Sequence, residues 1–174
     1  TGKGLIWCDP LYPFLTSDRD SPEAFLQRTK EVDDFLQEDG SDTLMMNYVT
    51  LVFATARLKA QIMLDIRRAY ALKDLERLRI IAHSPLENLQ ALYEKLRNAH
   101  MLLWERDFKR NGWELLCLRY GATIGRIQDV QGEISRYCDH ALSTIPELDE
   151  TPLNASRKGG MQFYQTYVVP SHYL

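Results

Sequence analysis

The chain has 174 residues, of which 45% are hydrophobic and 26% are charged, and its formal net charge at pH 7 is −3. This length and composition predict a single soluble domain with a core of its own. The scattered Lys and Arg argue against a nucleic-acid interface, which needs clustered positive charge, and the uncharged stretch 44–56 is shorter than the roughly 20 residues of a membrane span.

The first twenty residues predict a short strand followed by a loop. Residues 5–8 are apolar, Asp9 ends this run, and two prolines punctuate the residues that follow. Because no partner strand comes next, we expect a fragment of a longer protein. Residues 1–20 would be left from another domain, and residues 21–174 would form a helical domain.

The N-terminus and the cysteines favour a cytoplasmic location. The apolar run near the N-terminus is too short for a signal peptide. Cys8, Cys117 and Cys138 are odd in number and widely spaced, which predicts reduced thiols rather than a disulfide framework.

Four helical stretches follow. Ser21 is suited to cap the first, which Gly40 ends, and Asp42 is suited to cap the second, which runs to about residue 70. The second is apolar on two faces, so we place it at the centre of the bundle. The remaining stretches are 73–109, which Pro85 must kink or break, and 113–140.

These patterns predict an all-α fold. Its form would be a four-helix-like bundle with a short N-terminal strand remnant and an extended C-terminal tail, since residues 162–169 alternate weakly and are rich in Tyr, Phe and Val. Gly121, Gly125 and Gly132 fall near one face of the last helix, which predicts a neighbour packed very close to it.

No motif for catalysis, cofactor binding or metal binding is present. The Glu-x-x-His pairs of metal-binding bundles are missing, and the four histidines are isolated, so we expect neither a metal nor a cofactor. The aromatic segment 104–120 is suited to a ligand platform or to an aromatic core, and the size of the bundle favours a core. Arg119 and Arg126 are suited either to buried ion pairs or to contacts with a neighbouring domain.

The segment from Trp104 onward resembles a known family. Its motifs are Trp104, Phe108-Lys109-Arg110-Asn111-Gly112-Trp113-Glu114, Leu118-Arg119-Tyr120-Gly121, Gly125-Arg126 and Ile145-Pro146-Glu147-Leu148. They are similar to the helical domain that follows the catalytic barrel in one subgroup of glycoside hydrolase family 20, the bacterial β-N-acetylhexosaminidases. The resemblance covers the chain from about residue 5 onward.

A second feature of that family is similar to Ile6-Trp7-Cys8-Asp9. In the family, the eighth barrel strand ends in a Trp that walls the sugar subsite, and an acid two residues later accepts hydrogen bonds from sugar hydroxyls. The resemblance implies that Trp7 and Asp9 bind substrate in the full-length enzyme, with Asp standing where the longer Glu is commoner. The alternative is a Trp at a strand end that packs on the first helix.

The catalytic pair of the family is an adjacent Asp-Glu on an earlier barrel strand. There the substrate's acetamido oxygen attacks the anomeric carbon, the Asp orients it, and the Glu protonates the leaving oxygen, which departs from the usual two-carboxylate scheme. Asp149-Glu150 spells the same dipeptide, but no strand is predicted before it. We therefore interpret it as a solvated turn and expect no catalytic residue in this chain.

The resemblance implies a non-catalytic accessory domain of an enzyme that removes terminal N-acetylhexosamine. Its partners would be the catalytic barrel of the same polypeptide, the glycan through that enzyme, and a second copy if the domain supports a dimer. One rival is a free-standing helical module that recruits a protein partner. Another is a bundle that binds a small ligand in a deep internal pocket.

Overall fold

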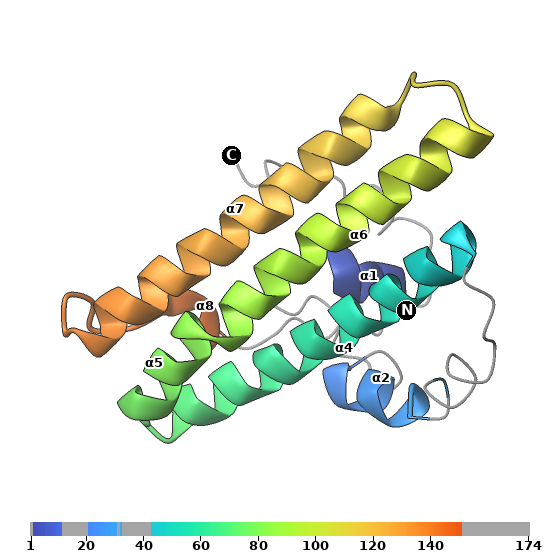
Figure 1. Cartoon of the computed structure of the whole chain (residues 1–174). Helices are drawn as coiled ribbons and strands as arrows, with labels where there is room; N and C mark the ends of the chain where they lie inside the picture. The colour runs from blue at the N-terminus through green and yellow to red at the C-terminus, as the bar shows by residue number, and fades with distance from the viewer. Residues whose placement is uncertain (1, 12–20, 31, 33–42, 151–174) are drawn as a thin grey trace, which may run out of the picture.

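The computed structural model describes residues 2–11, 21–30, 32 and 43–150, and in this part of the chain it is helical and contains no strand (Figure 1). This confirms the all-α fold class. The described helices are α1 Gly2–Trp7, α2 Pro22–Arg28, α4 Leu44–Ala71, α5 Leu75–His83, α6 Pro85–Asp107, α7 Trp113–Cys138 and α8 Pro146–Asp149.

Three long helices, α4, α6 and α7, form the body of the molecule. In Figure 1 they run side by side, with α6 packed against both α4 and α7, while α5 joins them at one end. The short helices α1 and α2 both pack on α4, which confirms that this helix is central. None of the described helices is long and apolar enough to cross a membrane.

Local signals set several helix boundaries. The side chain of Ser21 accepts a hydrogen bond from the backbone N–H of Ala24 at 3.2 Å, as its capping role predicts. The predicted break at Pro85 is confirmed, since α5 ends at His83 and Pro85 begins α6, where its missing N–H costs nothing.

Two predicted boundaries need correction. The first helix was expected to continue to Gly40, but α2 ends at Arg28 and a turn follows at residues 29–30; residues 33–40 lie outside the described residues. The cap of α4 is Thr43, which accepts from the N–H of Met46 at 3.2 Å, rather than Asp42. The predicted extended tail at 162–169 also lies outside the described residues.

The predicted strand remnant at 5–8 is wrong. Residues 2–7 form helix α1, and the side chains of Leu5 and Ile6 are buried in the core. An apolar run this short fits a strand or a buried helix equally well by pattern. A short helix makes some of its backbone hydrogen bonds internally, and side chains can bind its last carbonyls, whereas a strand needs a partner strand, and the described residues offer none.

The predicted close packing at the glycines of α7 is also wrong. A Cβ added at Gly121, Gly125 or Gly132 would meet no atom within 4 Å outside its own helix. The helix packs inward through Tyr120, Ile127, Val130, Ile134 and Cys138, all of which are buried. The periodicity placed the glycines near one face, but that face does not look at a neighbour within the described residues.

We therefore expect Gly132→Ala to stabilise the chain. Gly132 is exposed and helical, and a Cβ there meets open space, so the gain in helix propensity should raise the free energy of unfolding by about 0.5–1 kcal/mol. Urea denaturation measures it. Gly112→Ala is the matched control and should destabilise, because Gly112 has φ of 92°. A lower midpoint for Gly132→Ala would show that this face is packed.

Candidate functional site

Residues 6–11 receive contacts from all three long helices; we call them the anchored segment. Its backbone carbonyls accept hydrogen bonds from side chains of α4 and α6, and its side chains contact α7. The five anchoring residues are Lys59 and Arg67 of α4, Tyr93 of α6, and Tyr120 and Arg126 of α7. The two predicted site residues, Trp7 and Asp9, both belong to this segment.

Lys59 is a fully buried lysine whose ammonium holds the backbone of the segment. Its side chain is 0% exposed, and Nζ donates to the carbonyl oxygen of Ile6 at 3.0 Å, to that of Cys8, and to Tyr93 Oη at 3.3 Å. An ammonium has three N–H donors, so these three acceptors use all of them. Burial lowers the pKa of Lys59, and the nearby Cys8 and Asp9 act in the opposite direction.

Tyr93 and Arg67 complete the backbone anchors. Tyr93 Oη donates to the carbonyl oxygen of Ile6, and Arg67 Nη2 donates to that of Leu11 at 2.9 Å. The Tyr93 side chain is fully buried, and burial raises the pKa of its hydroxyl well above the ordinary value. The hydroxyl therefore remains a hydrogen-bond donor at neutral pH.

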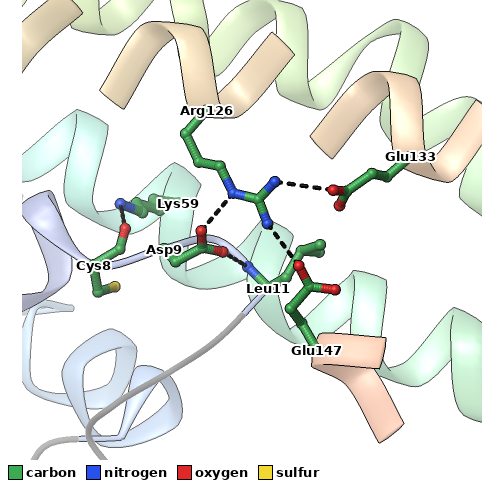
Figure 2. A network of polar contacts seen from close by, with 7 residues as sticks. All are labelled: Cys8, Asp9, Leu11, Lys59, Arg126, Glu133 and Glu147. Atoms are coloured by element: carbon green, nitrogen blue, oxygen red, sulfur yellow. Dashed lines mark hydrogen bonds and ion pairs between the residues drawn. The ribbon is translucent and has the colours of Figure 1, made fainter. Parts of the chain in front are cut away.

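Arg126 of α7 holds the Asp9 side chain (Figure 2). Its Nε donates to Asp9 Oδ2 at 2.5 Å, and its two terminal nitrogens donate to Glu133 at 3.1 Å and to Glu147 at 3.3 Å. The N–H of Leu11 donates to Asp9 Oδ1 at 2.8 Å. Burial alone would lower the pKa of Arg126, but Asp9 and Glu133 raise it above its ordinary value.

The sequence left open whether Arg126 forms buried ion pairs or contacts a neighbouring domain. The structure shows that it forms partly buried ion pairs. Its side chain is 25% exposed and that of Asp9 is 24% exposed, so water screens the pair only in part. Because the partners lie on the N-terminal segment, on α7 itself and on α8, one guanidinium ties three parts of the chain together.

Trp7 lies against α7 through its ring. Its centroid is 5.0 Å from that of Tyr120 with an interplanar angle of 66°, an edge-on arrangement, and the Arg119 guanidinium is 6.0 Å from the Trp7 ring. Trp7 is only partly buried. The structure therefore brings Trp7 and Asp9 to one helix, where their partners Tyr120 and Arg126 lie about two turns apart.

Lys59, Arg67 and Tyr93 were not among the residues singled out from the sequence. A signal for Lys59 existed: it shares a helical face with Thr55, Ile62 and Ile66, all of which are buried. A lysine within such a stripe indicates a buried ammonium that needs acceptors. Which acceptors it finds depends on the tertiary fold.

The aromatic segment forms a cluster around His100 that only partly matches the predicted core, since Tyr120 is buried, Trp104 and Trp113 are partly buried, and Phe108 is 62% exposed. The rings of Tyr48, Trp104, Trp113 and Tyr120 surround the imidazole, with centroids 4.8 to 6.3 Å away. His100 Nδ1 lies 3.0 Å from Tyr120 Oη, so this cluster adjoins the ring on which Trp7 packs. Burial lowers the pKa of His100.

Asp149-Glu150 lies at an exposed turn, as interpreted from the sequence. Asp149 is the last residue of the single-turn helix α8, and Tyr70 Oη donates to its Oδ1 at 3.0 Å. Within the described residues, no group of three His, Cys, Asp or Glu side chains is placed to hold a metal ion.

We expect Arg126→Met to destabilise the chain by about 2 kcal/mol, because it leaves three partly buried carboxylates without their shared cation. Chemical denaturation measures the effect. Arg106→Met is the matched control, since Arg106 pairs with Asp107 on an exposed surface and should change the midpoint very little. Equal effects of the two variants would contradict the anchoring role.

His100 should make the fold less stable in mild acid. Its folded pKa is lower than the ordinary 6.5, so below that pH the unfolded chain binds a proton that the folded chain resists. This contribution to stability is present above pH 6.5 and is lost as pH falls, by at most about 1.4 kcal/mol per pH unit. His100→Gln should flatten the stability profile between pH 7 and 5, and an unchanged slope would contradict the assignment.

A known family matches nearly the whole chain. The family model described as the Glycoside Hydrolase 20C C-terminal domain matches residues 1–168 and thus includes the anchored segment and every described helix. No curated protein matches the chain.

Proposed function

We propose that this chain, which belongs to the Glycoside Hydrolase 20C C-terminal domain family, is the non-catalytic helical domain of a β-N-acetylhexosaminidase and presents Trp7 and Asp9 to the sugar. In this proposal residues 1–20 join the end of the catalytic barrel to the helical domain 21–174. The observation that carries it is the convergence of three long helices on the segment that bears both residues.

The geometry of Asp9 is compatible with sugar binding. The N–H of Leu11 donates to one oxygen of the Asp9 carboxylate, and the Nε of Arg126 donates to the other. The Asp9 side chain is 24% exposed, so solvent reaches part of it. The two bonds also hold the carboxylate in one orientation, which lowers the entropy lost when a hydroxyl binds.

Trp7 would supply the apolar wall. Its ring packs against Tyr120 in a T-shaped arrangement, and Trp7 is only partly buried, so part of the side chain stays accessible. In substrate-assisted hydrolysis the acetamido oxygen must approach the anomeric carbon closely. A wall that holds the sugar and its acetamido group in that geometry acts on the chemical step.

The outer face of α7 supports contact with another body. Leu115 and Leu118 are 63% and 69% exposed, and Leu118 lines an open groove with Trp113, Cys117 and Ala122. Exposed leucines beside such a groove are typical of interaction surfaces. We assign this face to the catalytic barrel, because the same helix contacts Trp7 and Asp9; a second copy of the chain is the other candidate.

The proposal places the enzyme in a bacterial cytoplasm. The three cysteines are free in the structure, and Cys8 and Cys138 are buried, which suits a reducing compartment.

The chain by itself should not hydrolyse an aryl N-acetyl-β-glucosaminide, because the proposal assigns the acid and the orienting Asp to the barrel. Turnover by the purified chain would overturn the proposal.

In the full-length enzyme, Trp7→Ala should lower kcat/KM by about a hundredfold through misplacement of the sugar. Asp9→Asn should lower it by roughly tenfold or more, because hydrogen bonds to a charged acceptor contribute about 1.5–3 kcal/mol. The penalty of Asp9→Asn should shrink for a deoxy sugar that lacks the contacted hydroxyl.

Kinetics with an aryl N-acetyl-β-glucosaminide and its deoxy analogues test both variants. Leu72→Ala is the control, since Leu72 is 71% exposed and lies in the turn after α4. If both variants keep wild-type kinetics, the chain contributes scaffold alone.

A further inference from the structure

We propose that Lys59 is a positioning residue for Trp7: its buried ammonium holds the carbonyl groups of the two residues that flank Trp7 and so sets the place of the sugar wall. This inference rests on the proposed function. Its first support is geometric, since the carbonyls that Lys59 Nζ binds belong to Ile6 and Cys8, the two neighbours of Trp7.

The carbonyls that Lys59 binds lie at the C-terminal end of α1. The last carbonyls of a helix have no donor within the helix, and buried carbonyls need one. An ammonium is well suited to this place, because it supplies several N–H groups and a positive charge to the negative end of the helix. Figure 2 shows Lys59 reaching from α4 to Cys8.

Burying the Lys59 ammonium costs free energy, and this cost argues that the lysine has a specific role. A buried ammonium loses its hydration, and a methionine of similar size would fit the apolar face of α4 without that loss. Ala56, Ile62, Met63 and Ile66 on the same helix are all buried and apolar. What the lysine supplies and a methionine does not is a set of three directed hydrogen bonds.

Tyr93 links the same anchor to a second helix. Its hydroxyl accepts from Lys59 Nζ and donates to the carbonyl oxygen of Ile6, so α4 and α6 fix that peptide unit together. The Trp7 ring then contacts α7 through Tyr120. Side chains of α4 and α6 thus hold the backbone around Trp7, and α7 holds its ring. These contacts leave Trp7 little freedom to move.

The test compares Lys59→Met with Lys95→Met, a control on the exposed side of α6. With 5-fluorotryptophan incorporated, the chain gives one ¹⁹F signal for each of its three tryptophans, and Trp7→Phe identifies that of Trp7. Lys59→Met should shift or broaden the Trp7 signal and leave those of Trp104 and Trp113 in place. Lys95→Met should change none of them.

Kinetics in the full-length enzyme supply the second readout. Lys59→Met should lower kcat by about ten- to a hundredfold, with a much smaller change in KM, because misplacement acts on the chemical step. Lys95→Met should keep wild-type kinetics. An unmoved Trp7 signal, or a KM effect with unchanged kcat, would overturn the positioning role.

If circular dichroism shows that Lys59→Met unfolds, Tyr93→Phe takes its place, since it removes one acceptor of Lys59 and one donor to Ile6 while keeping the ring; an unmoved Trp7 signal in that variant overturns the inference. If the Trp7 signal moves but Trp7→Ala leaves kinetics unchanged, the proposed sugar contact is wrong while Lys59 still positions the ring.

Discussion

The arrangement depends on one buried charge. Lys59 sits at the centre of the apolar face of α4, and its ammonium is stable there because three acceptors meet it: two carbonyls of the N-terminal segment and the hydroxyl of Tyr93. Removing the segment would take away two of these three acceptors, and an ammonium that lacks its partners is far costlier to bury than an apolar side chain. The bundle and the N-terminal segment are therefore energetically coupled.

A second charge, on Arg126, extends this coupling to the side chain of Asp9 and to α8. Lys59 of α4 binds backbone carbonyls of the N-terminal segment, and Arg126 of α7 binds the carboxylate of Asp9. A bundle that only braced a barrel would not need its charged groups directed at residues 6, 8, 9 and 11 near the N-terminus. This direction links the helical fold to the sugar site that we propose, and in this proposal the accessory domain takes a direct part in substrate geometry.

Much of the helical framework could be predicted from the sequence, because its signals are local. Ser21 caps α2 and Pro85 begins α6, each within one turn of its own position, as the sequence predicted. Features that depend on tertiary contact could not be predicted. The apolar run at 5–8 fits either element by pattern. The pattern places the glycines of α7 near one face but does not show that this face has no close neighbour among the described residues. The carbonyl acceptors of Lys59 could not be predicted, because they lie 51 and 53 residues away. Trp7 and Asp9 were singled out through a family resemblance, whereas the residues that hold them emerged from the structure.

The most direct test is a crystal structure of the full-length enzyme with N-acetylglucosamine in its active site. The account predicts the Trp7 ring in contact with the sugar and an Asp9 carboxylate oxygen within hydrogen-bonding distance of a sugar hydroxyl. It also predicts that Lys59 and Arg126 keep the partners that they have here. A sugar bound with neither Trp7 nor Asp9 in contact would contradict the account and reduce the N-terminal segment to a structural part of the bundle.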